Sequence, residues 1–226
     1  MIGVFDSGVG GMASYEELRA LLPRADMVYL ADRENAPYGT KQKDEIIRLV
    51  KRDLSRLQAF GCKRILMACC TASSVYPSLD EREKEICLPI ISPAARIAAR
   101  YERVTVIATE HTVSSGAFQK EILSHSSACA ISAIPLPELV SLVEGGLKDG
   151  CVSESGAKHL DKIAEKILAL KTDALVLGCT HFSRVEKEFK KRLAGVSVIS
   201  PAREGAIAMA RLIGGKGCGR GRNVYL

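Results

Sequence analysis

The chain has 226 residues, of which 47% are hydrophobic and 26% are charged, as in soluble proteins that form one large domain or two small ones. No apolar run is long enough to span a membrane, and the N-terminal segment lacks the basic and apolar regions of a secretory signal, so we expect a cytoplasmic protein with no membrane partner. The net charge is only +6 and the basic residues follow amphipathic helical patterns, which argues against nucleic-acid binding.

The eight cysteines lack the regular spacing of a disulfide framework. Together with the expected compartment, this predicts reduced thiols.

Short apolar runs alternate with amphipathic segments of helical period, which is typical of an α/β protein with parallel sheets. The predicted strands cover residues 2–5, 27–30, 64–68, 90–91, 104–108, 130–134, 174–177 and 196–199. The clearest predicted helices cover residues 12–22, 41–59 and 158–171. The glycine-rich segment 214–222 is expected to be mobile.

The order of these signals repeats along the chain. Cys69 and Cys179 each follow a predicted strand, and they stand 110 positions apart. We therefore predict two similar parallel-sheet α/β domains related by pseudo-symmetry, with the active site in the cleft between them. The first domain is expected to comprise residues 1–92 plus 201–226, and the second residues 93–200.

The two thiols are the strongest candidates for chemistry, because ligands of open parallel sheets bind outside the carboxyl ends of the strands. Each thiol lies at a predicted strand-to-helix junction with a threonine close behind it, Thr71 two positions after Cys69 and Thr180 directly after Cys179. Backbone N–H dipoles at such a junction are expected to lower the thiol pKa from about 8.5 toward neutrality. His181, two residues after Cys179, can exchange protons with a bound substrate.

Other readings of the same motifs stay open at this stage. The pattern Gly8-x-Gly10-x-x-Ala13, with Asp32 after the second strand, fits a dinucleotide-binding fingerprint, or else a tight structural turn. Asp6 at the strand tip would repel a pyrophosphate but would suit an ammonium group. A zinc site built from the two thiols, Cys70 and His181 is also conceivable, although adjacent cysteines and Cys-x-His depart from the usual ligand spacings.

Taken together, six motifs resemble those of the glutamate racemases in the aspartate/glutamate racemase superfamily. They are Asp-Ser-Gly-x-Gly-Gly at 6–11, Pro-Tyr-Gly at 37–39, Cys-x-Thr-Ala-Ser at 69–73, Thr-x-x-Thr-x-x-Ser at 109–115, Leu-Val-x-Leu-Val-Glu-x-Gly at 139–146 and Leu-Gly-Cys-Thr-His at 177–181. They occur in order through nearly the whole chain. The resemblance implies interconversion of L- and D-glutamate without a cofactor or a metal, and supply of D-glutamate for peptidoglycan. The resemblance is also compatible with a homodimer.

The resemblance also implies roles for individual residues. Cys69 would act as acid or base on the D-enantiomer and Cys179 on the L-enantiomer, from opposite faces of the α-carbon. The implied substrate-binding residues are Asp6, Ser7, Tyr38, Gly39, Cys70, Thr71, Thr180 and His181, and the auxiliary ones are Asp32 and Glu144. Cys70 departs from the family, which normally has asparagine there. Alternatives are therefore a racemase of the same fold acting on another substrate such as aspartate, a nucleotide-binding protein, and a catalytically silent relative.

Overall fold

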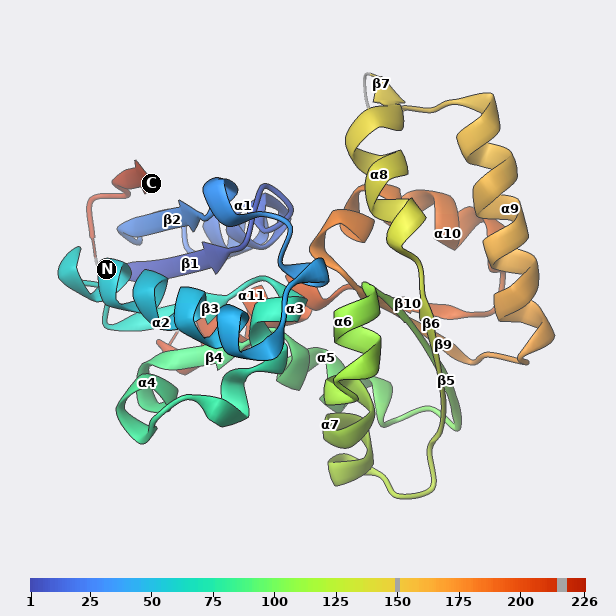
Figure 1. Ribbon diagram of the computed structural model, residues 1–226, viewed down its shortest axis with the longest axis horizontal. Coiled ribbons are helices and arrows are strands. Elements are labelled where there is room, and N and C mark those ends of the chain that lie inside the picture. Colours follow the sequence, from blue (N-terminus) through green and yellow to red (C-terminus); the bar gives the residue numbers. More distant parts are fainter. Residues whose placement is uncertain (149–150, 215–218) are drawn as a thin grey trace.

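Two parallel sheets form the framework of the protein, and they lie in the two lobes seen in Figure 1. This computed structural model describes residues 1–148, 151–214 and 219–226, without the side chains at 144, 147, 148 and 151. The predicted fold class, two parallel-sheet α/β units, is confirmed.

The first sheet has five parallel strands, all in contact with β1 or its neighbours. Their order across the sheet is β11 (Asn223–Tyr225), β2 (Met27–Ala31), β1 (Ile2–Asp6), β3 (Arg64–Met67) and β4 (Cys87–Pro89). Every residue of β1 is buried. Strands covered on both faces read as continuous apolar runs, which is why the sequence revealed them.

The second sheet repeats this arrangement with four parallel strands. Their order is β10 (Ser197–Ile199), β9 (Ala174–Gly178), β5 (Arg103–Ala108) and β6 (Ala130–Pro135). In both sheets the first strand in sequence lies between the second and the third, with the fourth beyond the third. Cys69 and Cys179 each follow the third strand of their sheet, so the two thiols occupy equivalent positions.

Helices occupy most of the connections between the strands. They are α1 (Met12–Leu21), α2 (Lys43–Ala59), α3 (Cys70–Ser74), α4 (Glu81–Ile86), α5 (Ile91–Ala98), α6 (Glu110–Ser114), α7 (Ala117–His125), α8 (Pro137–Gly146), α9 (Glu154–Ala169), α10 (Glu186–Arg192) and α11 (Pro201–Leu212). Four short 3₁₀ turns accompany them, η1 (Arg33–Asn35), η2 (Tyr38–Thr40), η3 (Tyr76–Ser78) and η4 (Thr180–Val185). A short antiparallel pair, β7 (Leu147–Lys148) with β8 (Cys151–Val152), follows α8.

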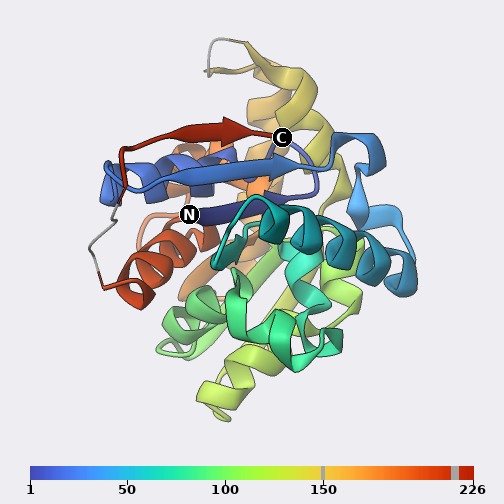
Figure 2. The ribbon, with the colours of Figure 1, turned by 90° about the vertical axis from the view of Figure 1, so that its left-hand side faces the viewer.

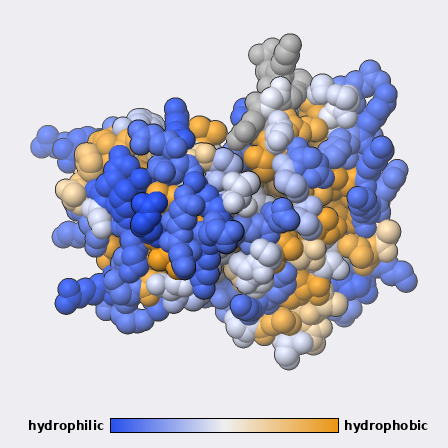
Figure 3. All heavy atoms as spheres, viewed as in Figure 1, coloured by the Kyte–Doolittle hydropathy of each residue, from blue (hydrophilic) through white to orange (hydrophobic). Residues whose placement is uncertain are grey.

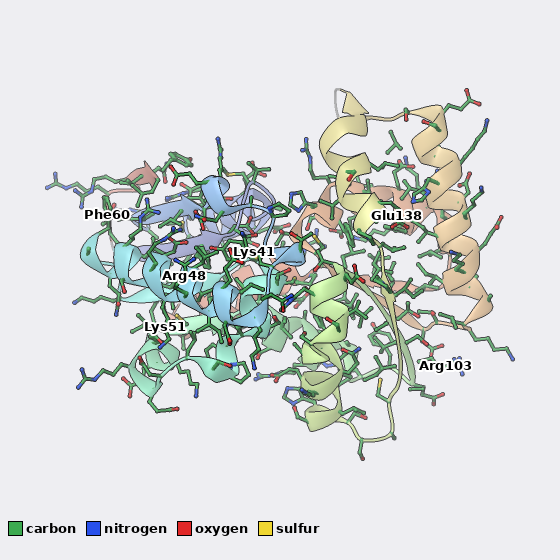
Figure 4. The ribbon with its side chains drawn as sticks, in the orientation of Figure 1. Lys41, Arg48, Lys51, Phe60, Arg103 and Glu138 are labelled. Atoms are coloured by element: carbon green, nitrogen blue, oxygen red, sulfur yellow. The ribbon has the colours of Figure 1, made fainter. Side chains whose placement is uncertain are left out.

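Helix α2 illustrates how the amphipathic pattern becomes packing. Ile46, Leu49 and Leu57 are buried against the first sheet, while Arg48 and Lys51 lie on the outer side of the helix (Figure 4). The face of the molecule over α2 is correspondingly hydrophilic in Figure 3. Arg103, also labelled in Figure 4, begins β5 in the other lobe.

One apolar cluster joins the two sheets. It takes in Val4 and Leu66 of the first sheet, Val106 and Val176 of the second, and residues of α1, α5 and α11 between them. The opposite face of each sheet has its own cluster, one under α2 and one under α8, α9 and α10. The strand ends of the two sheets are therefore held at a fixed separation by a shared core.

Two predictions about local structure are wrong. The strand expected at 90–91 lies at 87–89 instead, where Cys87 pairs with Ile65, and the chain enters α5 at Ile91. Pro93 sits in the first turn of that helix, where its missing N–H costs no hydrogen bond.

The tail expected to be mobile is folded where it is described. The backbone N–H groups of Arg220 and Arg222 donate to the carboxylate of Asp26 at 3.0 and 2.9 Å, and β11 then extends the sheet beside β2 (Figure 2). Residues 215–218 of the predicted mobile segment lie outside the described residues. The domain boundaries expected near 92 and 200 stay predictions.

Candidate active site

Four strand ends meet around one cavity of about 580 Å³. In the first sheet Ser7 follows β1 and Cys69 follows β3; in the second, Thr109 follows β5 and Cys179 follows β9. All four residues line the cavity. In each sheet the two strands concerned are neighbours at the point where the strand order reverses, which is where α/β sheets bind ligands. In Figure 4, Lys41 just after η2 and Glu138 in α8 mark two sides of this region.

The thiol of Cys69 is held by two polar groups, one from the loop after β1 and one from helix α3, which Cys69 caps. Its Sγ lies 3.1 Å from the Ser7 hydroxyl and accepts the backbone N–H of Ala72 at 3.4 Å. Cys69 is only 5% exposed. Both neighbours can donate to a thiolate, so the site is built to accommodate the charged form once it is produced.

The thiol of Cys179 also has a polar side chain beside it, in this case an imidazole. Its Sγ lies 3.6 Å from Nδ1 of His181, and the residue is 6% exposed. An imidazole at this distance can exchange a proton with the sulfur or with a bound ligand.

The expectation that both thiols have lowered pKa values is wrong. Burial raises the pKa of Cys69 to about 11, and the nearby Asp6 carboxylate adds to the rise. Burial likewise raises the pKa of Cys179 far above its ordinary value. The N–H groups at the two junctions do favour the thiolate, but the loss of water around the buried sulfurs outweighs them.

Asp6 lies behind the cavity wall rather than in it. It is fully buried; its Oδ2 accepts the Gly8 N–H at 2.9 Å, and its Oδ1 accepts the Thr180 hydroxyl at 3.4 Å. Burial raises the pKa of Asp6, and His181 together with the loop N–H groups offsets only part of that rise. Asp6 thus ties the loop after β1 to the loop after β9.

The same loop does not provide a phosphate site. Its Gly8 N–H is already bonded to Asp6, and a Cβ added to Gly11 would stand 2.5 Å from that of Asp6. The glycines make room for the protein's own carboxylate, which is the feature that would repel a pyrophosphate. The nucleotide-binding alternative therefore finds no support in this geometry.

Tyr38 is an anchored wall residue, with its hydroxyl turned away from solvent. The hydroxyl donates to Asp32 at 2.6 Å and to Asp53 at 3.3 Å, and Asp32 also accepts from Asn35 and pairs with Arg52 at 2.7 Å. Burial raises the pKa of Asp32, but the three donors outweigh burial and leave that pKa below its usual value. Asp32 thus lies behind Tyr38 and reaches the cavity only through it.

Cys70 and Thr71 begin α3 and line the cavity next to Cys69. Cys70 is 2% exposed and also belongs to the apolar cluster that joins the sheets. Burial, followed by the proximity of Cys179 and Cys69, raises its pKa well above the ordinary value. The Thr71 hydroxyl lies 3.1 Å from those of both Thr109 and Thr112.

Two glycines allow the loops of the two sheets to touch. A Cβ at Gly10 would stand 2.4 Å from the Thr180 hydroxyl oxygen, and one at Gly39 would stand 3.1 Å from Cβ of Thr109. These close approaches hold both lobes against the cavity.

Of the residues predicted for the site, nine line the cavity: Ser7, Tyr38, Gly39, Cys69, Cys70, Thr71, Cys179, Thr180 and His181. The side chain of Glu144 lies outside the described residues, although its backbone belongs to α8. Sequence reasoning gave no role to Arg33, Thr109, Glu110 and Ser141, which also line the cavity. The sequence does contain a signal for Thr109, because this residue directly follows a predicted strand, much as the two thiols do.

Among the described residues, no group of three or more His, Cys, Asp or Glu side chains is arranged to hold a metal ion. The zinc alternative thus has no ligand set in that part of the chain. A search of the same residues for a helix long and apolar enough to cross a membrane finds none.

Comparison with known proteins agrees with this architecture. Residues 13–209 match the model of the Asp/Glu/Hydantoin racemase family. The chain belongs to this racemase family. It is 37% identical to a glutamate racemase of Thermus thermophilus over 100% of this chain and 86% of the relative, and 34% identical to one of Aquifex aeolicus over 96% and 85%. The resemblance found in the sequence is confirmed, and the chain is an amino-acid racemase.

Solved structures of the racemase family share the fold. A glutamate racemase isoform from Bacillus anthracis superimposes with a TM-score of 0.86 at 29% identity, covering 100% of this chain and 86% of that one. The glutamate racemase of Francisella tularensis, in complex with D-glutamate, gives 0.84 at 25% identity, covering 99% and 85%. An aspartate racemase from Picrophilus torridus, at 18% identity and a TM-score of 0.70, shows the fold alone.

Proposed function

We propose that this racemase interconverts L- and D-glutamate by proton transfer between two cysteines and without a cofactor. The observation that carries the proposal is the placement of two buried thiols, Cys69 and Cys179, at equivalent strand ends of the two sheets in one cavity. Two acid/base groups on opposite walls are what inversion at a carbon requires, because the proton must leave one face and return to the other. The names of the relatives support glutamate as the substrate.

In this mechanism one cysteine, as a thiolate, removes the α-proton and becomes a thiol. The other, as a thiol, donates its proton to the opposite face and becomes a thiolate, so the overall charge is unchanged. Cys69 takes the proton of D-glutamate and Cys179 that of L-glutamate. The α-carbanion between the two steps is stabilised by donors placed around the substrate carboxylates. We assign this task to the Ser7 hydroxyl and to the backbone N–H groups around Gly39, Thr71 and Thr180.

The raised thiol pKa values fit a base that forms only in the complex. In the free protein, burial and the Asp6 carboxylate keep Cys69 protonated at neutral pH. A bound amino acid brings an ammonium group into the cavity, and a positive charge close to a thiol lowers its pKa. The thiol that acts as the base then releases its proton to solvent, and Ser7 beside Cys69 or His181 beside Cys179 stabilises the thiolate that remains.

We further propose that the D-glutamate supplies peptidoglycan synthesis in the cytoplasm.

Asp6, although it lies behind the cavity wall, provides the negative charge that favours binding of the substrate ammonium group.

The test is the exchange of the α-proton in deuterated water, followed by NMR, together with racemisation followed by circular dichroism. Cys69→Ser and Cys179→Ser are each expected to abolish racemisation while keeping the fold. Cys62→Ser is the matched control, since Cys62 is equally buried, at 5% exposure, in the cluster under α2. Near wild-type racemisation by either active-site variant would overturn the two-base assignment. Faster turnover of aspartate than of glutamate would transfer the proposal to that substrate.

A further inference from the structure

Three threonine hydroxyls form a closed triangle between the two sheets. Thr71, in α3, follows the first sheet, whereas Thr109 and Thr112, at the start of α6, follow the second. The Thr71 oxygen lies 3.1 Å from each of the other two, and Thr109 donates to Thr112 at 2.9 Å. Thr112 is 1% exposed.

The triangle has one consistent set of donors. Since Thr109 donates to Thr112, the proton of Thr112 is left for Thr71, and that of Thr71 for Thr109. Each hydroxyl then donates once and accepts once, and the Thr109 oxygen also accepts the backbone N–H of Thr112 at 3.3 Å. Hydrogen bonds in a closed ring polarise and so strengthen one another. The ring is therefore a rigid link between α3 and α6.

This link lies between the chain segments that position the two thiols. Thr71 is two residues after Cys69, so its position follows that of α3. Thr109 follows Ala108, which pairs with Gly178 directly before Cys179. Gly39 also packs closely against Thr109. The ring thus connects the segment that follows Cys69 to helix α6, which follows β5, the strand paired with the one that leads into Cys179.

We propose that Thr112 is a positioning residue of the racemase, which sets the register of Cys69 against Cys179 through this hydroxyl ring. The inference rests on the proposed function. Proton transfer requires the reacting atoms to approach to about 3–3.5 Å, and a misplacement of about 1 Å can reduce a rate about 100-fold. Thr112 is not among the residues that line the cavity. Its effect is accordingly expected on catalysis more than on substrate binding.

The test compares Thr112→Val, which keeps the shape of the side chain and removes the hydroxyl, with Thr112→Ser, which keeps the hydroxyl. Thr112→Val is expected to lower kcat for glutamate at least tenfold with KM changed less than threefold, and to increase the isotope effect with glutamate deuterated at the α-carbon. Thr112→Ser should restore kcat to within threefold of wild type. If the valine variant does not fold, Thr112→Ala serves in its place.

Thr105→Val is the matched control. Its hydroxyl lies 2.6 Å from that of Thr172, and both residues are buried in the second lobe, Thr105 within β5 and Thr172 shortly before β9, and neither lines the cavity. This variant should lose a similar amount of thermal stability and keep kcat within twofold. If Thr112→Val also keeps kcat within twofold, the inference is overturned although the function stands. If the wild-type protein does not racemise glutamate, it is the proposed function that fails.

Discussion

Removing the Tyr38 hydroxyl tests how the wall of the cavity is anchored. In Tyr38→Phe the ring stays, but Asp32 loses a donor at 2.6 Å and Asp53 loses one at 3.3 Å, in a region where both carboxylates are at most 3% exposed. A hydrogen bond to a charged group contributes about 1.5–3 kcal/mol. For a protein of this size, that loss corresponds to a fall in Tm of roughly 3–12 °C.

The loss should depend on pH in a defined direction. The bonds to Asp32 leave its pKa below the usual value in the folded state. Their stabilisation is therefore fully present above the unfolded pKa of about 3.9 and disappears as the pH falls through the folded pKa. The difference between wild type and Tyr38→Phe is thus largest near neutrality and shrinks below about pH 4.

Urea unfolding followed by circular dichroism at neutral and acidic pH measures both quantities. Tyr76→Phe is the control, because its hydroxyl donates to the backbone oxygen of Lys84 at 3.3 Å, a neutral bond that contributes about 0.5–1.5 kcal/mol. If Tyr38→Phe costs no more than this control at pH 7, or if its effect is independent of pH, the anchoring role of the carboxylates is refuted.

Two further substitutions probe the cavity directly. Gly10→Ala would place a Cβ 2.4 Å from the Thr180 hydroxyl oxygen and 3.0 Å from Nδ1 of His181, so kcat/KM should fall at least tenfold, about 1.4 kcal/mol or more. The control is Gly145→Ala, whose Cβ would meet open space in α8. Equal activities of the two variants would contradict the close contact at Gly10. Cys70→Asn, assayed under reducing conditions, restores an amide donor worth about 1.5–3 kcal/mol toward a charged group and should lower KM for glutamate by about tenfold. An unchanged or higher KM would mean that the cavity is arranged around the thiol.

Local patterns in the sequence suffice to predict most of the strands and helices and to single out the candidate reactive residues. Buried strands such as Ile2–Asp6 and Ala174–Gly178 read as continuous apolar runs, and each thiol follows such a run directly, so its place at a sheet edge could be inferred from local signals. The motifs were specific enough to indicate the family that the comparisons show. Boundaries such as 87–89 were missed because an apolar run of a few residues does not distinguish a strand from the start of a buried helix.

The electrostatics of the site and the contact partners of its residues depend on tertiary packing. A junction motif predicts donors near a thiol, but the pKa of Cys69 depends on how much water and which charges surround it, and these come from residues distant in sequence. The hydroxyl ring of Thr71, Thr109 and Thr112 is likewise invisible in the sequence, since its members lie 38 and 41 positions apart. The described end of the glycine-rich tail is ordered because Asp26, far from it in the chain, accepts its N–H groups. Such contacts depend on the packing of the two sheets against each other, and local patterns carry no record of them.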